Sequence, residues 1–213
     1  MSTSAALSEH DSKRLLADHG VPVSTERVVA TPDEAVAAAA EVGFPCVVKL
    51  CGAAITHKTE IGGVRLGLGS AEAVQAAATE LLAAGPDGAE LLIAEQIAGN
   101  RELIAGVTED PQFGRVLMLG IGGIFAEVLA DVAFRLLPAT RAEIASMLDD
   151  LANPGFLGPF RGEPAVDRDA VVDTLVGLAA AIEDRPDIES VDVNPLIVRD
   201  GRPIAVDALV VLR

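Results

Sequence analysis

Hydrophobic positions in the first part of the chain switch between a helical spacing and a strand-like spacing. Apolar residues spaced three or four apart predict a helix over Ser8–His19, a second after Thr31 and a third after Ser70. Thr31 opens the capping box TPDE, and Ser70 is a second capping residue. Short apolar runs between these helices predict strands. The order over 21–96 is therefore strand, helix, strand, strand, helix, strand, which indicates a compact α+β unit.

Two of these strands surround the most unusual polar stretch of the chain. GFPCVVKL is one apolar run and GGVRLGL is the next, with HKTE between them. The second run alternates, so we expect three apolar side chains to share one face: Val64, Leu66 and Leu68.

The second part of the chain is richer in strands. AELLIAEQI, RELIAGVT and GRVLMLGIGG are apolar runs separated by turn residues, and helices are predicted after Thr140 and over Asp167–Glu183. A closing hairpin is predicted from SVDVNPLIV and PIAVDALVVL, because RDGR lies between them and Asp-Gly favours a tight turn. We therefore expect a small subdomain over 21–96 and a larger one made of 1–20 and 97–213.

Charge and composition exclude several classes of function. The formal net charge of −16 repels nucleic acid and anionic lipid, and Trp and Tyr are absent, so we expect neither a nucleic-acid nor a membrane partner. No apolar run reaches the ~20 residues that a transmembrane helix needs, and the N-terminal residues do not resemble a secretory signal. Only two cysteines are present, Cys46 and Cys51. We expect reduced thiols and a cytoplasmic protein.

The predicted closing hairpin carries a candidate metal site. Asp192 and Asn194 are two residues apart and share one face of a strand, and Asp207 follows on the returning strand. Carboxylate and amide oxygens suit Mg²⁺, which also keeps waters and binds substrate phosphates. The alternative is a solvated sheet face in which Asn-Pro serves only as turn chemistry.

The HKTE stretch carries a candidate phosphate site. The chain has thirteen arginines and three lysines, yet Lys49 and Lys58 both lie here, with His57 between them. A lysine closing a buried strand offers a compact charge for a phosphate, although a strand-end lysine that reaches solvent is the common alternative. His57 is a candidate acid, base or phosphate acceptor, or an ordinary loop residue. Gly62 and Gly63 permit close approach of an anion, or simply a tight turn.

A second glycine-rich stretch, GIGGIF at 120–125, imitates a dinucleotide-binding fingerprint. Phe125 stands where that fingerprint needs its third glycine, and no βαβ unit follows, so a Rossmann-type NAD site is rejected. A lysine, glycine-rich loops and a metal-binding hairpin together describe a phosphate site on two α+β units.

This order of motifs resembles the ATP-grasp β subunit, or domain, of NDP-forming acyl-CoA synthetases such as ADP-forming acetate–CoA ligase, which are related to the succinyl-CoA synthetase β subunit. The resemblance covers nearly the whole chain. The pieces that carry it are GFPCVVKL, HKTEIGGV, AEQIAGNRELIAGVTEDPQFG, MLGIGGIFAEVLADVAFRLLP and SVDVNPLIV…AVDALV. It implies an α/β (α+β) ATP-grasp fold, in which two subdomains hold the nucleotide between them.

The resemblance also implies roles for individual residues. Catalysis would use His57 as the phosphate acceptor, with Asp192 beside it. Mg²⁺ would be bound by Asn194 and Asp207. The remaining implied positions bind ATP or ADP through phosphate, adenine-edge or ribose contacts: Lys49, Lys58, Gly62, Gly63, Glu95, Ile97 and Glu102. Cys51-Gly52-Ala53-Ala54 departs from the Ser-Pro common in the family, which leaves the conformation of that loop open.

The implied reaction is carboxylate + CoA + ATP ⇌ acyl-CoA + ADP + phosphate. No CoA-binding Rossmann unit is visible in this sequence, so we expect a CoA-binding α subunit as partner. Two alternatives stay open: a stand-alone ATP-grasp carboxylate–amine ligase, and a non-catalytic nucleotide-binding regulatory module.

Overall fold

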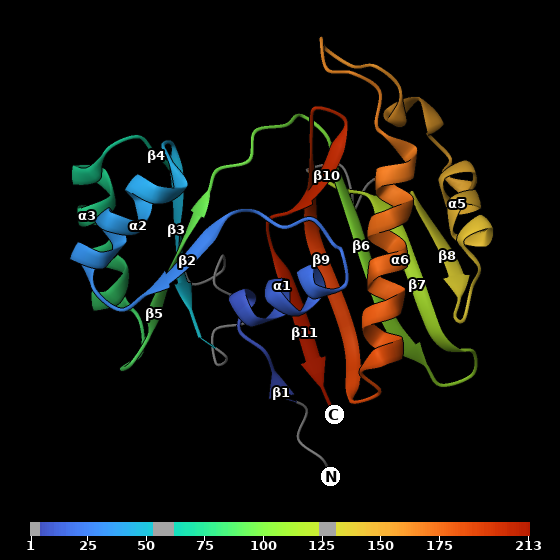
Figure 1. Ribbon diagram of the computed structural model, residues 1–213, viewed down its shortest axis with the longest axis horizontal. Coiled ribbons are helices and arrows are strands. Elements are labelled where there is room, and N and C mark those ends of the chain that lie inside the picture. The colour runs from blue at the N-terminus through green and yellow to red at the C-terminus, as the bar shows by residue number, and fades with distance from the viewer. Residues whose placement is uncertain (1–4, 53–61, 124–130) are drawn as a thin grey trace. The chain divides into compact units, whose positions relative to one another are not determined.

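The chain folds into two units, each built on an antiparallel sheet (Figure 1). The computed structural model describes residues 5–52, 62–123 and 131–213. The smaller unit contains Ala6–Asp11 and Ser24–Gln96, and the larger contains Ser12–Val23 and Ile97–Arg213. The mixed helix and sheet content agrees with the expected fold class. None of the helices in the described part of the chain is long and apolar enough to span a membrane.

The first helix belongs to both units. Helix α1 (Glu9–Asp18) follows the short strand β1 (Ala5–Ala6) and is capped by Ser8, whose Oγ accepts the amide hydrogen of Asp11. The division between the units falls within α1, after Asp11. In the larger unit, Ser12 Oγ accepts a hydrogen bond from the amide of Val210. Residues near the start of α1 therefore pack in one unit, and residues further along pack in the other.

The smaller unit is a four-stranded sheet with two helices on one face. Its elements are β2 (Glu26–Val29), α2 (Pro32–Val42), β3 (Cys46–Cys51), β4 (Val64–Leu68), α3 (Ala71–Ala84) and β5 (Glu90–Glu95), and the strand order is β2-β5-β3-β4. Cys46, Val48 and Leu50 of β3 join the core beneath α2 and α3. The alternation of a strand then directs Val47, Lys49 and Cys51 to the opposite face.

The expectation that Val64, Leu66 and Leu68 share one face of β4 is wrong, because Leu68 pairs with Cys46 whereas Val64 pairs with Lys49, on the other face of β3. Leu66 is 68% exposed, whereas Leu68 packs against the core. The β3–β4 register advances two residues on β3, from Cys46 to Val48, but three on β4, from Leu68 back to Arg65. Gly67, with φ of 71°, lies within this bulge. The extra residue breaks the two-residue period, so Leu66 points to solvent on an edge strand.

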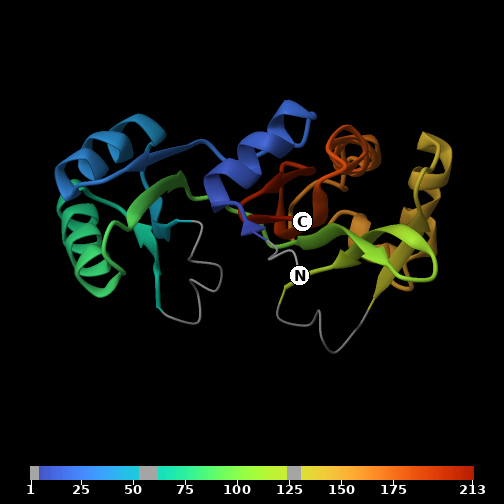
Figure 2. The same ribbon diagram turned by 90° about the horizontal axis from the view of Figure 1, so that it is seen from below.

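The larger unit is a seven-stranded sheet covered by helices on one face (Figure 2). Its main order is β1-β11-β9-β6-β7-β8, and β10 also pairs with β9. The sheet elements are β6 (Glu102–Asp110), β7 (Gly114–Ile121), β8 (Val132–Leu136), β9 (Ile188–Arg199), β10 (Arg202–Ala205) and β11 (Ala208–Leu212). The helices are α5 (Arg141–Asp150), the 3₁₀ turn η1 (Pro154–Leu157) and α6 (Arg168–Asp184). Inward residues of β6 and β7 are fully buried, among them Leu103, Leu117 and Leu119.

The closing hairpin differs from its expected form. The segment predicted as one returning strand is divided into β10 and β11, and both pair with β9. Asp207 lies between these two strands rather than within one. Its carbonyl accepts a hydrogen bond from the amide of Asn194, 3.2 Å away. Asp207 and Asn194 are therefore neighbours across the hairpin, as the sequence predicted.

Candidate functional site

Lys49 is the charged centre of the smaller unit. It lies within β3 and is 7% exposed, so the alternative of a lysine that reaches solvent is wrong. Its Nζ donates a hydrogen bond to Glu9 Oε1 at 2.7 Å, and both side chains are buried. Burying a charge is unfavourable unless a partner compensates it. The carboxylate of Glu9 therefore compensates the buried ammonium group of Lys49.

Glu9 was not foreseen from the sequence. It lies forty positions before Lys49 in the chain, and the structure brings the two side chains together. Glu9 begins α1, where the helix dipole favours a carboxylate. The only signal in the sequence was an acidic residue in the first turn of a helix, which is common.

Gly62 and Gly63 lie beside Lys49. Lys49 pairs with Val64 across β3 and β4, and the amide of Leu50 donates to the carbonyl of Gly63 at 2.8 Å. Gly62 is exposed and has a φ of 67°, a value that disfavours side chains. The structure thus brings the predicted lysine and the glycine pair together. His57 and Lys58 lie outside the described residues.

The predicted adenine-edge residues stand where the chain passes from one unit to the other, after Gln96. Glu95 ends β5, and its amide donates to the carbonyl of Thr25 at 2.9 Å. A nucleotide contact through the backbone of Glu95 would therefore use its carbonyl. Ile97 is buried, 7% exposed, so its side chain belongs to the core and only its backbone can serve a ligand.

Asp192, Asn194 and Asp207 gather on the hairpin of the larger unit. Asp192 and Asn194 project from the same face of β9, and Asp207 is opposite Asn194. Although Asp192 has exposed surface, desolvation by the surrounding protein raises the pKa of its carboxyl, and the nearby Asp207 carboxylate raises it further. Two carboxylates that repel each other favour a cation between them.

This set of donor atoms suits Mg²⁺, which keeps waters and substrate phosphates as ligands, better than a metal whose ligands are all protein side chains. Among the described residues, no group of three or more His, Cys, Asp or Glu side chains is arranged to hold a metal ion. The hairpin offers two carboxylates and one amide oxygen. Mg²⁺ usually takes one or two protein carboxylates and completes its octahedral shell with waters and phosphates.

Glu102 lies on the wall of a cavity of about 660 Å³ within the larger unit. Glu102 begins β6, and its carbonyl accepts the amide hydrogen of Gly122 at 2.7 Å. Residues of the segment 153–161 also line this cavity. Gly122 and Gly123, the last two glycines of the GIGG stretch, line the same cavity as Glu102.

Buried charges that the sequence did not reveal hold segment 152–164, part of which lines the cavity. Arg101 is 1% exposed and donates to the carbonyls of Gly158 (2.7 Å) and Pro164 (2.5 Å) and to Glu163. Asp131 is 4% exposed and accepts the amide hydrogens of Ala152 and Asn153. Burial raises the pKa of Asp131, but hydrogen bonds from Asn153 and Ala152 outweigh it, and the net pKa is lowered. Segment 152–164 is therefore fixed from both ends.

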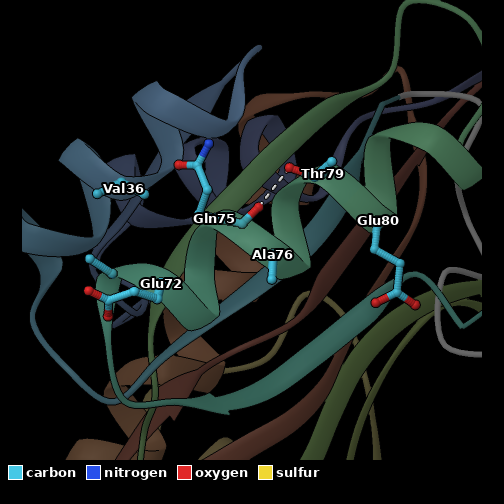
Figure 3. Close-up of a pocket in the computed structure, with 7 residues that line it drawn as sticks. Val36, Glu72, Gln75, Ala76, Thr79 and Glu80 are labelled. Carbon is cyan, nitrogen blue, oxygen red and sulfur yellow. Dashed lines mark hydrogen bonds between the residues drawn. The ribbon is translucent and has the colours of Figure 1, made fainter.

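A second cavity, of about 670 Å³, lies over helices α2 and α3 (Figure 3). Its lining includes Glu72, Gln75 and Glu80. The hydroxyl of Thr79, which also lines it, donates a hydrogen bond to the carbonyl of Gln75. Of the predicted site residues that the structure describes, none lines this cavity. It is a surface groove between helices and contributes nothing to the candidate site.

The model of the ATP-grasp domain family matches residues 2–212. This chain belongs to the ATP-grasp family. The resemblance found in the sequence is confirmed, and the ATP-grasp chain can be compared with its relatives over nearly its whole length.

Similar proteins include two β subunits of ADP-forming acetate–CoA ligases from Pyrococcus furiosus. The ATP-grasp chain is 38% identical to the β subunit of ligase II, with 98% of this chain and 92% of that one aligned. It is 34% identical to the β subunit of ligase I, with 97% and 91% aligned. It also matches 30% of the ADP-forming acetate–CoA ligase II of Archaeoglobus fulgidus at 38% identity, over 97% of its own length.

Solved structures agree in fold. A chain of the dinucleotide-forming acetyl-coenzyme A synthetase 1 of Ca. Korarchaeum cryptofilum, in complex with coenzyme A and Ca-AMPCP, gives a TM-score of 0.91 at 34% identity, covering 98% of this chain and 94% of that one. Another structure of that enzyme holds coenzyme A and Mg-AMPPCP, with a phosphohistidine segment pointing towards the nucleotide-binding site. Its TM-score is 0.83 at 35% identity, over 96% and 92% of the two chains.

Proposed function

We propose that this chain is the nucleotide-binding β component of an ADP-forming acyl-CoA synthetase. The overall reaction is carboxylate + CoA + ATP ⇌ acyl-CoA + ADP + phosphate. The main support is the end-to-end similarity to two acetate–CoA ligase β subunits, each aligned over more than nine-tenths of its length. A stand-alone carboxylate–amine ligase is disfavoured, because 97–98% of the chain is accounted for by this match.

ATP or ADP is the nucleotide, and Mg²⁺ accompanies it. Lys49 would bind the phosphates, with Gly62 and Gly63 allowing close approach. The buried ion pair of Lys49 supports this role, since the fold already maintains its ammonium out of bulk water. Asn194 and Asp207 would hold Mg²⁺, which neutralises phosphate charge when bound. The adenine edge would be contacted by the carbonyl of Glu95 and the backbone of Ile97. The ribose would be contacted by Glu102.

His57 is the proposed phosphate acceptor. A neutral imidazole nitrogen would attack the γ-phosphorus of ATP; a nitrogen–phosphorus bond forms, the bond to the bridging oxygen breaks, and ADP leaves. Lys58 lies next to His57 in the sequence and would balance the phosphoryl charge. Asp192 would orient the imidazole. The raised pKa of Asp192 suits a carboxyl group that exchanges a proton or a hydrogen bond with such a partner.

The phosphoryl group would then pass to a CoA-binding α subunit. The need for a partner is supported by the names of the Pyrococcus furiosus relatives, which are subunits, and by the longer Archaeoglobus fulgidus relative, of which this chain matches 30%. A cytoplasmic location is expected, where CoA and ATP are both available.

Labelling with γ-³²P-ATP tests the relay. We expect the wild type to retain label that is stable to base and labile to acid, and to pass it to the α partner. His57→Asn should bind ATP and retain none. His19→Asn is the matched control, because His19 contacts the carbonyl of Leu15 and Asp184 within the larger unit. Wild-type transfer by His57→Asn would refute the role of His57.

A further inference from the structure

Segment 152–164 contains a tight turn of unusual composition. Phe160 and Glu163 exchange both backbone hydrogen bonds, at 3.2 and 2.9 Å, so Arg161 and Gly162 are the central residues of a two-residue hairpin. Their φ angles are 47° and 86°. Positive φ at both central positions defines a type I′ turn, which favours Asn-Gly or Asp-Gly.

A second turn in the same chain shows what the backbone alone selects. In the β9–β10 hairpin the two central residues are Asp200 and Gly201, with φ of 51° and 82°. Among the described residues, Arg161 and Asp200 are the two non-glycine residues with positive φ. Asp tolerates this region and suits the turn, whereas Arg brings no such benefit. Because residues held in sparsely populated backbone regions cluster at functional sites, the arginine side chain needs another explanation.

The surroundings of Arg161 point to a ligand. Its guanidinium lies 5.1 Å from the centroid of the Phe160 ring, and no hydrogen bond or ion pair joins it to any residue that the structure describes. The other cation lining the cavity, Arg101, is committed to backbone carbonyls and Glu163. Among the described residues that line the cavity, Arg161 is thus the cation whose guanidinium contacts a ring but has no hydrogen bond or ion pair.

The lining of the cavity combines charges of both signs with aromatic side chains. Arg161 and Glu102 both line it, together with Phe156 and Phe160. An anion would be attracted to the arginine and repelled by Glu102, whereas hydroxyl groups would find an acceptor in Glu102. A volume of about 660 Å³ lies within the usual range for a small-molecule site.

We propose that this cavity binds a small organic phosphate with a ring and hydroxyl groups, such as a nucleoside monophosphate, through Arg161. The phosphate contacts the guanidinium, the ring packs on Phe156 and Phe160, and a hydroxyl donates to Glu102. This site rests in part on the proposed function, because Glu102 is the residue proposed there to contact the ribose of ATP, and the two ligands would compete for it. It requires no Mg²⁺, because a cation is already part of the cavity wall.

Calorimetry with AMP, adenosine and orthophosphate, in EDTA, tests this site. AMP should bind more tightly than either fragment. Arg161→Asn should weaken AMP binding by roughly 10- to 100-fold, the range expected for loss of a charged hydrogen bond. It should not lower the Tm, because Asn suits the type I′ turn better than Arg. Arg202→Asn, an exposed arginine beside the other turn, is the matched control and should change nothing.

Three results would overturn the proposal: no AMP binding by the wild type, unchanged AMP binding by Arg161→Asn, or a lower Tm for that variant. Asn194→Ala separates this site from the proposed function. It should lose Mg²⁺-dependent ATP binding and keep AMP binding in EDTA. If it keeps both, the metal site fails and the Arg161 site stands.

Discussion

The buried pair of Lys49 and Glu9 makes a quantitative prediction about stability. Their atoms are 2.7 Å apart, and the side chains are 8% and 4% exposed. Removing one partner of a buried ion pair costs about 3–5 kcal/mol, because a charge is left in the interior. We therefore expect Lys49→Met and Glu9→Leu each to lower the free energy of unfolding by about this amount.

The double variant should behave differently. Replacing both charges with apolar side chains of similar volume is often neutral, since neither charge then needs compensation. We expect Glu9→Leu/Lys49→Met to lose far less stability than the sum of the two single variants. Far-UV circular dichroism during urea unfolding is the suitable assay, because the chain has no Trp and no Tyr to report by fluorescence. Additive losses would refute the pairing as an energetic unit.

The same variants report on nucleotide binding. Lys49→Met should weaken ATP binding by about 1.5–3 kcal/mol, or roughly 10- to 150-fold. Glu9→Leu removes the carboxylate that competes with phosphate for the ammonium, so ATP should bind at least as tightly as to the wild type. If Lys49→Met binds ATP as the wild type does, the lysine is structural and the phosphate site lies elsewhere.

Three further predictions concern the larger unit. Asn194→Ala and Asp207→Ala should each raise the Mg²⁺ concentration needed for ATP binding by roughly tenfold or more, and an unchanged Mg²⁺ titration would make the hairpin purely structural. Burial and the nearby Asp207 raise the pKa of Asp192 in the folded state. Protonated Asp192 therefore contributes to the stability of the folded state, and this contribution to stability is lost as pH rises through the folded-state pKa. Asp192→Asn should therefore be more stable than the wild type at neutral pH without Mg²⁺, with the difference vanishing in acid; urea unfolding across pH would show it. Arg101→Met should lower stability by about 3–5 kcal/mol and expose segment 152–164 to proteolysis, and an uncleaved variant of wild-type stability would show that Arg101 does not hold the segment.

Local features of the fold could be predicted from the sequence. Thr31 and Thr140 form the capping boxes that their residue spacing indicates, with Glu34 and Glu143 as reciprocal partners. Such caps depend on residues three apart, so the sequence contains all the information they need. The hairpin at Asp200–Gly201 follows for the same reason, since a two-residue turn selects its own residues.

Features that depend on distant residues could not be predicted. Glu9 and Lys49 are forty positions apart, and nothing in either local sequence indicates the pair. Asp131 and Arg101 likewise act on a segment far along the chain, through backbone groups that have no sequence signature. The bulge at Gly67 moved Leu66 to solvent because one extra residue reverses the side-chain alternation.

The candidate sites share a physical property: each contains a charge that folding alone does not favour. Glu9 and Lys49 carry their charges in the interior. Ionising Asp192 costs free energy because its carboxyl is desolvated and lies near Asp207. Arg161 occupies a turn whose backbone favours Asn or Asp. Natural sequences break local rules chiefly where function requires it. A ligand that binds only the folded state adds stability by RT ln(1 + [L]/Kd), so Mg·ATP should raise the Tm of the wild type. It should raise that of Asp192→Asn less, because this variant is relieved of the repulsion with Asp207 before any cation is bound.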